Sequence, residues 1–255
     1  FTSTGARLRA AQLAGTAHPT LLPAAVAGSP CTNLGVYSNG TVSPVRAKGD
    51  GFTYRFNVNC KPNSDVMVYA TVSRGFRPGG INRRGDFGGY QPDYLKNYEI
   101  GFKTTPMRGV RLNGAIYQQD CDKFQFSYLG PNSFTIITNG PTARIRGIEL
   151  DLGYNVENFS FNVNGSYTDA VMSKNLCHRI DPTFTCTSPG NSVDAFAGTR
   201  LPVTPEFKVA GTARYTVPVG SAKAYGQVNA SYQSGASADL RIAQSATLGR
   251  LNGYG

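Results

Sequence analysis

The sequence predicts an all-β protein: an antiparallel transmembrane β-barrel, present here as part of a large barrel. Three observations support this prediction. The 255 residues include 30 Gly, 14 Tyr and 14 Phe but only 16% charged residues, a composition rich in turns and aromatic side chains. Period-two alternation of apolar and polar residues runs from residue 51 onward. No apolar stretch reaches the ~20 residues that a membrane-spanning helix needs, so any spanning must be done by strands.

The alternation defines eight expected strands, each with one apolar and one polar face. In the first strand Phe52, Tyr54 and Phe56 alternate with Arg55 and Asn57. By the same criterion the eight strands are expected at residues 52–59, 65–73, 97–103, 110–128, 134–154, 159–168, 207–215 and 223–232. A soluble β-sandwich alternates in the same way, so alternation alone does not indicate a membrane protein.

The later strands repeat the pattern with a strongly polar second face. In the sixth strand Phe159 and Phe161 alternate with Ser160 and Asn162. Buried polar groups without partners would cost about 1–3 kcal/mol each, so this face cannot form a dry core. We therefore expect it to line a wet or plugged lumen while the apolar face meets lipid. Because this lumen face is too polar to pack tightly, we expect a wider barrel with further strands.

The fourth and fifth strands are expected to be unusually long. At ~3.3 Å per residue, about 20 residues exceed the thickness of a membrane. Polar residues gather in the middle of the fourth strand, at Gln118, Gln119, Asp120 and Asp122. We expect the two strands to leave the membrane as a β-hairpin, with two separate shorter strands as the alternative.

The connections between strands distinguish a membrane barrel from a sandwich. Short turns are expected at residues 60–64, 105–108, 155–157 and 218–221, all on one rim. The connections between them are longer or lie on longer strands, at residues 74–94, 130–133 and 169–203. Short turns on one rim and long loops on the other are typical of an outer-membrane barrel.

The chain is expected to divide at residue 50. Residues 51–255 are predicted to form the C-terminal part of a β-barrel, truncated at its end. Residues 1–50 are rich in Ala, Gly and Pro and are predicted to be an irregular, loop-rich barrel segment with a possible strand near residues 33–38.

The distribution of charge and the two histidines argue against nucleic-acid binding, enzyme activity and a metal site. The net charge of +10 is spread singly along strands and loops, without the Lys/Arg run that nucleic-acid binding would favour. Lipopolysaccharide phosphates or an anionic ligand are the expected partners of such a surface. The two histidines, His18 and His178, belong to no metal-spaced motif, so we expect no enzyme activity, no metal site and no cofactor.

Five cysteines cannot all pair within one chain. Cys177 and Cys186 bracket a short Pro-containing segment, and we expect a disulfide between them in an oxidising compartment. Such a bond would restrain an exposed loop by about 2–3 kcal/mol. Two unpaired thiols are the alternative, and Cys121 is expected to be unpaired.

Three segments together resemble a known family. They are VYATVSRGFRPGG at residues 68–80, NYEIGFK at residues 97–103 and ARIRGIELD at residues 143–151. Residues 51–235 resemble the barrel of TonB-dependent receptors. The resemblance implies a barrel of about 22 strands with an N-terminal plug. It also implies uptake of scarce nutrients, such as ferric siderophores or cobalamin, with energy passed from the inner membrane by TonB. No plug, TonB box or terminal aromatic strand is recognised in these residues.

The densest cationic group lies at the first long loop. Arg74, Arg77, Arg83 and Arg84 are expected to bind an anionic ligand, because guanidinium groups bind carboxylates and phosphates bidentately. The alternative is that these arginines contact lipopolysaccharide or only confer solubility.

The expected function is that of a bacterial outer-membrane receptor for a scarce nutrient, with a ferric siderophore as the expected cargo. Its expected partners are lipid and lipopolysaccharide, the TonB system through an unseen plug, a ferric chelate and possible outer-membrane proteins, but not nucleic acid. The alternative is a scaffold or passive pore that binds partners through its exterior loops.

Overall fold

The computed structural model describes residues 35–38, 41–44, 46–82, 89–129, 135–177, 183–238 and 240. The chain divides into two compact units. The larger unit comprises Gly51–Arg77, Asp93–Phe124 and Asn139–Gly255, and the smaller one Phe1–Asp50, Pro78–Pro92 and Gln125–Thr138. The described part of the chain contains no helix long and apolar enough to cross a membrane.

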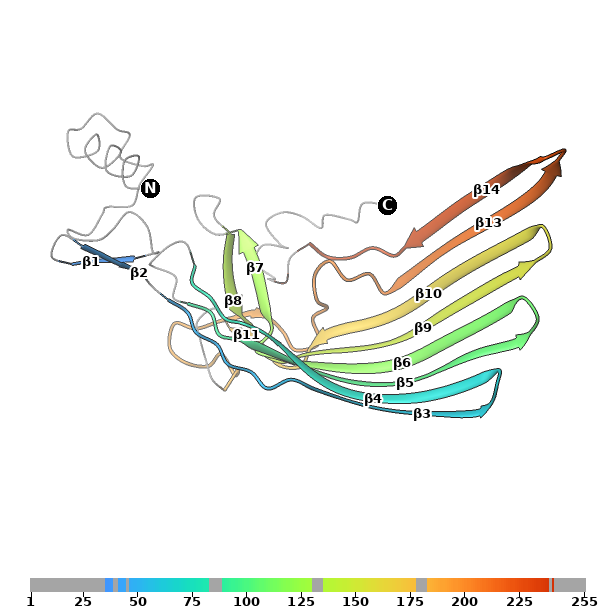
Figure 1. Ribbon diagram of the computed structural model, residues 1–255. Coiled ribbons are helices and arrows are strands. Elements are labelled where there is room, and N and C mark those ends of the chain that lie inside the picture. Colours follow the sequence, from blue (N-terminus) through green and yellow to red (C-terminus); the bar gives the residue numbers. More distant parts are fainter. Residues whose placement is uncertain are drawn as a thin grey trace, which may run out of the picture. The chain divides into compact units, whose positions relative to one another are not determined.

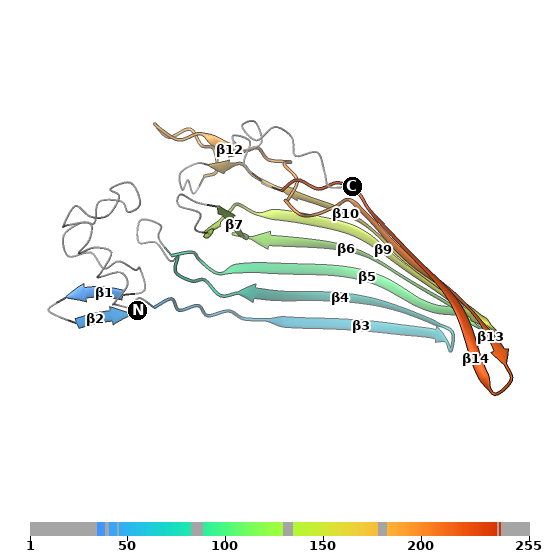
Figure 2. The ribbon, with the colours of Figure 1, turned by 90° about the horizontal axis from the view of Figure 1, so that it is seen from above.

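The larger unit is built on one eight-stranded antiparallel sheet, in which each strand pairs with its predecessor along the chain. Its strands are β3 (Tyr54–Asn63), β4 (Val66–Arg77), β5 (Asp93–Met107), β6 (Val110–Asp122), β9 (Ala143–Val156), β10 (Phe159–Met172), β13 (Phe207–Val219) and β14 (Ala222–Gln233). The sheet is curved, with β3 and β14 as its two edges (Figures 1 and 2). This confirms the predicted all-β antiparallel architecture.

Tight turns join these strands in pairs at one end of the sheet. The four turns connect β3 to β4, β5 to β6, β9 to β10 and β13 to β14, and all lie at the same end (Figure 1). Gly109, Glu157 and Gly220 have positive φ in three of them. A Cβ at Gly109 would lie 2.4 Å from the carbonyl oxygen of Asn155, so the second turn requires glycine. The predicted placement of all four turns on one rim is confirmed.

Longer connections leave the opposite end of the sheet. They run from Arg77 to Asp93, from Asp122 to Ala143 and from Met172 to Phe207. The unequal lengths at the two ends match the asymmetry of outer-membrane barrels, in which the long connections face the exterior. We call this end of the sheet the exterior end.

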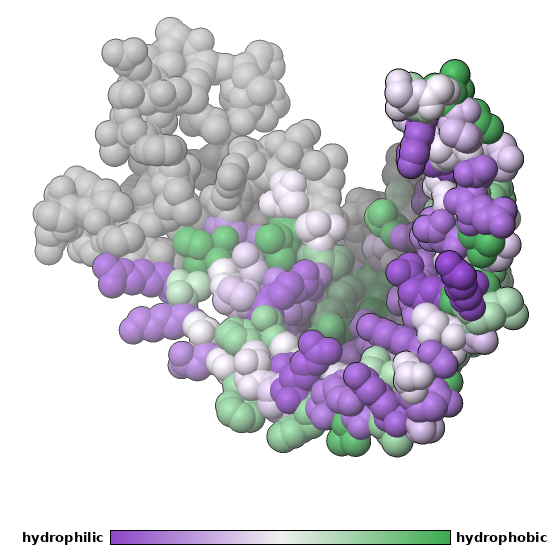
Figure 3. Space-filling view, turned by 45° about the vertical axis from the view of Figure 1, so that its right-hand side comes forward, coloured by the Kyte–Doolittle hydropathy of each residue, from purple (hydrophilic) through white to green (hydrophobic). Residues whose placement is uncertain are grey.

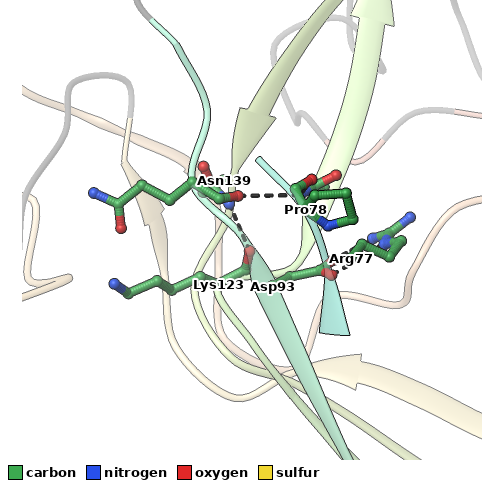
Figure 4. Close-up of polar contacts among 7 residues, drawn as sticks. Arg77, Pro78, Asp93, Lys123 and Asn139 are labelled. Atoms are coloured by element: carbon green, nitrogen blue, oxygen red, sulfur yellow. Dashed lines mark hydrogen bonds and ion pairs between the residues drawn. The ribbon is translucent and has the colours of Figure 1, made fainter. Parts of the chain in front are cut away.

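The prediction of two continuous long strands at residues 110–128 and 134–154 is wrong. The pairing stops after Asp122 and resumes at Gln125, and three residues separate the end of β8 from the start of β9. Lys123 has φ of 54°, a left-handed conformation that interrupts a strand, and Pro141 has no N–H to donate. Asn139 Nδ2 donates to the Lys123 carbonyl at 2.8 Å (Figure 4). The alternative of shorter separate strands is therefore correct.

The described residues of the smaller unit include two antiparallel strand pairs. Strands β1 (Gly35–Ser38) and β2 (Thr41–Pro44) pair antiparallel, as do β7 (Gln125–Leu129) and β8 (Thr135–Asn139), whose last residue is assigned to the larger unit. Gly80 and Tyr90 exchange two backbone hydrogen bonds of 3.0 and 2.9 Å. Asn82 hydrogen-bonds both the N–H and the carbonyl of Ile137, each at 2.9 Å. These bonds tie segments 78–92 and 125–138 together within this unit.

Candidate functional site

The register of the larger sheet separates an apolar outer face from a polar inner face. Residues directly opposite each other across a sheet share a face. One such row consists of Val58, Ala70, Ile100, Ile116, Ile148, Tyr167 and Phe207. We call the face that carries this row the outer face.

The outer face exposes its large apolar side chains. Ile100 is 59% exposed and Ile116 is 55% exposed, although both lie in central strands of the sheet. Hydrophobic side chains are visible on the surface beside hydrophilic ones (Figure 3). An apolar surface of this extent marks contact with another apolar phase, and hydrocarbon chains fit that requirement.

The inner face carries hydrogen-bonded polar side chains. The row next to Ile100 on the opposite face consists of Asn57, Thr71, Glu99, Tyr117, Gly147 and Thr168. Asn57 Nδ2 donates to Thr71 Oγ1 at 2.6 Å, and Tyr69 Oη donates to Glu99 Oε1 at 2.7 Å. These cross-strand bonds satisfy polar groups within a surface that water or another polar structure can cover.

Toward the turn end, the inner face mixes charges of both signs. A shallow hollow there is lined by residues that include Lys103, Asn113, Glu149, Asp151 and Lys208. Asn113 Nδ2 donates to Asp151 Oδ1 at 2.8 Å, and Arg111 Nη2 lies 3.4 Å from the same oxygen. The inner face there therefore carries charges of both signs, and two neighbouring side chains hold the Asp151 carboxylate.

Arg77, one of the predicted ligand-binding residues, is paired with a buried carboxylate. Its Nε lies 3.0 Å from each carboxylate oxygen of Asp93, and its Nη2 forms an ion pair with the same group (Figure 4). The Asp93 side chain is 4% exposed and that of Arg77 is 61% exposed. The hydrogen bond to Asp93 raises the pKa of the Arg77 guanidinium, which lies at the exterior end of β4. Arg77 therefore stays charged and partly accessible.

The structure separates Arg74 from Arg77. Residues three apart on a strand point to opposite faces, so Arg74 lies on the outer face, directly opposite Lys96. Its guanidinium carbon lies 4.5 Å from the centre of the Tyr94 ring. Arg83 and Arg84 lie outside the described residues. The period-two geometry of a strand is the sequence signal that separates Arg74 from Arg77.

Cys177 and Cys186 form a disulfide in the connection between β10 and β13, with their Cα atoms 5.3 Å apart. Cys177 ends the short strand β11 (Leu176–Cys177), which pairs with β12 (Val193–Ala195). Leu176, Cys186 and Ala195 are buried. The disulfide thus belongs to a small folded element at the exterior end of the sheet. His178 lies outside the described residues.

Two further cysteines, both with free thiols, lie among the described residues, and they differ in setting. Cys60 is exposed and shares a row of the outer face with Val68 and Phe102, whereas Cys121 is half-buried opposite Leu95 and Ala143 on the inner face. No group of three or more His, Cys, Asp or Glu side chains with metal-binding geometry occurs among the residues that the structure describes.

Sequence reasoning did not identify Asp93 as the partner of Arg77, nor the charged rows of the outer face near the exterior end. The pairing of Asp93 with Arg77 depends on the register of β4 and β5, which a long connection joins. Alternation within each strand does not determine that register. The charged rows were readable, because the alternation that contains Tyr98 and Ile100 continues back to Lys96 and Tyr94.

The family model for TonB dependent receptor-like β-barrels matches residues 32–255. The fold is similar to that of the ferric yersiniabactin uptake receptor FyuA from Yersinia pestis, with a TM-score of 0.55 and 16% identity over 72% of this chain and 26% of that one. It is also similar to the siderophore receptor PiuA from Acinetobacter baumannii, with a TM-score of 0.51 and 17% identity over 71% of this chain and 26% of that one.

The chain thus spans about a quarter of the length of these two structures, and at such identities the likeness concerns the fold alone. The family is one of receptors rather than enzymes, and its members lie in the bacterial outer membrane. Because the family model covers nearly the whole chain, the protein belongs to the TonB-dependent receptor-like β-barrel family.

Proposed function

We propose that this chain is the C-terminal part of the barrel of a receptor that imports a scarce nutrient, with a ferric siderophore as its cargo and energy supplied through TonB. Membership of the family supports the transport role. Two proteins of similar fold are described as a ferric yersiniabactin uptake receptor and a siderophore receptor. In this proposal, residues 51–255 contribute barrel strands and residues 1–50 a loop-rich barrel segment.

The observation that carries the proposal is the hydrogen-bonded polar inner face opposite an exposed apolar face. A sheet with these two faces is stable when lipid covers one and water or a plug covers the other. A polar lumen suits the passage of a bulky hydrophilic chelate. The inner face satisfies its own polar groups through pairs such as Tyr69 with Glu99, so it does not need a permanently bound ligand.

We propose that capture occurs at the exterior end, at the connection between β4 and β5. Arg77 stands at its base, fixed by Asp93 but still 61% exposed, and Arg83 and Arg84 follow in the sequence. Guanidinium groups bind carboxylate and phosphate oxygens in a bidentate manner, which favours anionic chelates. Arg74 is not included in this ligand-binding set, because its position on the outer face directs it away from the lumen.

Growth and uptake measurements test the proposal. A strain that lacks the full-length receptor should fail to grow on at least one ferric chelate under iron limitation, and uptake of that radiolabelled chelate should require TonB. The triple variant R77Q/R83Q/R84Q should bind the chelate more weakly than the wild type. This difference in affinity should decrease at high salt, because salt screens the attraction between the wild-type arginines and the chelate.

Equal growth of the deleted strain on every chelate tested would contradict the siderophore proposal. Uptake that continues without TonB would favour the alternative of a passive pore. Unchanged binding by the triple variant in an assembled barrel would remove these arginines from the site while leaving the transport role intact.

A further inference from the structure

Two rows of the outer face change from apolar to charged toward the exterior end. In one row Phe56, Val72 and Tyr98 are followed by Gln118, Arg146 and Asp169. The adjacent row, on the same face and nearer the exterior end, consists of Tyr54, Arg74, Lys96, Asp120 and Arg144. We call Arg74, Lys96, Arg144 and Arg146 the outer cation group.

The position of this group follows from the cost of charge in lipid. A cationic side chain on the lipid face of a barrel costs about 2–4 kcal/mol at the midplane and about 0–1 kcal/mol near the interface. The row of Ile100, Ile116 and Ile148 lies between the outer cation group and the turn end. The group therefore marks the level at which the outer face leaves the hydrocarbon, on the exterior side of the membrane.

Neighbouring side chains hold these cations against the sheet. Arg144 Nε lies 3.1 Å from Asp120 Oδ1, and Arg146 Nε donates to Gln118 Oε1 at 3.0 Å. Both arginines are thus bound through Nε. Among the described residues, the terminal Nη groups of both have no further hydrogen-bond partner. The terminal nitrogens are the pair that a phosphate binds bidentately.

The charges in the two rows do not cancel. Four cations stand against the carboxylates of Asp120 and Asp169, which leaves a net charge of +2. Asp122, one row further toward the exterior end, accepts a hydrogen bond from Thr142 Oγ1 at 3.1 Å. Buried Arg74 Nε has no hydrogen-bond partner in the described structure, and its guanidinium lies over the Tyr94 ring.

We propose that the outer cation group binds the lipid A phosphates of lipopolysaccharide in the outer leaflet. A phosphate at the boundary of the acyl chains would meet the free Nη groups, while the chains lie along the apolar row below. The outer cation group lies directly beside an apolar row of the same face. A lipid contacts both with its headgroup and its acyl chains, whereas a soluble anion would contact only the cations. The surface faces away from the lumen, so this binding is independent of nutrient capture.

Lipid retention by the full-length receptor tests the proposal. The receptor and its variants are purified in detergent, loaded with lipopolysaccharide, washed, and analysed for retained lipid by native mass spectrometry. The variant R74Q/K96Q/R144Q/R146Q removes the group. The matched control R55Q/K103Q/R111Q/K208Q removes four cations from the inner face of the same sheet.

Retention should fall about tenfold or more in the outer variant and stay within about twofold of wild type in the inner control. The charge-preserving variant R74K/R144K/R146K should retain an intermediate amount of lipid, because lysine keeps the charge but cannot bind a phosphate bidentately. Lipopolysaccharide stripped of its lipid A phosphates should bind wild type and the outer variant equally weakly. If the quadruple variant does not assemble, K96Q/R144Q should show an intermediate loss.

Four results would overturn the proposal. An assembled outer variant that retains as much lipid as the wild type would show that these cations do not select the lipid. An equal loss of lipid in the inner control would show the same. Tight binding of the dephosphorylated form would exclude phosphate recognition. Equal displacement by phosphatidylglycerol would show that any anionic phospholipid suffices and would exclude lipopolysaccharide as the specific ligand.

Discussion

The ring of Tyr117 lies over Gly147, directly opposite it on the inner face of the sheet. A Cβ at Gly147 would lie 2.4 Å from Tyr117 Oη and 2.5 Å from its Cζ. From this position the Tyr117 hydroxyl reaches Thr168 Oγ1 on the next strand, at 3.2 Å. The absence of a side chain at Gly147 therefore allows one ring to link three neighbouring strands. Tyr69 lies over Gly101 in the same way.

Replacing Gly147 by Val should destabilise the barrel. The new side chain would displace the ring and break the bond to Thr168, at a cost of about 1–3 kcal/mol in the free energy of unfolding. Urea unfolding of the full-length receptor in detergent micelles measures this. Gly226→Val is the matched control, because a Cβ there meets no heavy atom within 4 Å. Equal stability of the two variants would contradict the role of the ring.

The ion pair between Arg77 and Asp93 should stabilise the exterior end of the β4–β5 pair. Asp93→Asn should lower the free energy of unfolding by about 1–2 kcal/mol, a value discounted from that of a fully buried pair because Arg77 is largely exposed. A double-mutant cycle with Arg77→Gln isolates the coupling. Arg111→Gln, which breaks the exposed contact with Asp151, should cost about 0–1 kcal/mol. A coupling energy near zero for Arg77 with Asp93 would contradict this prediction.

Cys177 and Cys186 should be bonded in the mature protein, with Cys121 unpaired. Peptide mapping by mass spectrometry without reduction checks the bond directly. We expect a cross-linked pair of peptides containing residues 177 and 186, and an alkylated Cys121. Free, alkylatable thiols at both 177 and 186 after a non-reducing preparation would contradict the prediction and its assumption of an oxidising compartment.

The strands and their turns were predictable from the sequence because the physical signal is local. Alternation such as that of Tyr98, Glu99 and Ile100 reports which face meets lipid, and turns such as that at Gly109 follow from the gaps between alternating runs. The interruption at Lys123 was not predictable, since a left-handed lysine has no strong sequence signature. The alternation of apolar and polar residues on the two sides of Lys123 is the same whether the strand continues through this residue or is interrupted there.

The arginine group shows a different limit. Arg74 and Arg77 are close in sequence, but the period-two geometry of β4 places them on opposite faces. The partner of Arg77 depends on strand register, and the register follows from the pairing of whole strands rather than from any local motif. Nearness in sequence was therefore a poor guide to which charges act together.

The central claim is that the eight-stranded sheet is part of a membrane barrel with a lipid-facing and a lumen-facing side. Spin labels placed one at a time along β5 of the full-length receptor in bilayers test it most directly. Labels at Tyr98, Ile100 and Phe102 should be accessible to oxygen, and labels at Asn97, Glu99 and Lys103 to a water-soluble nickel chelate, in strict alternation. Nickel accessibility at all six positions, or no alternation between them, would contradict the account.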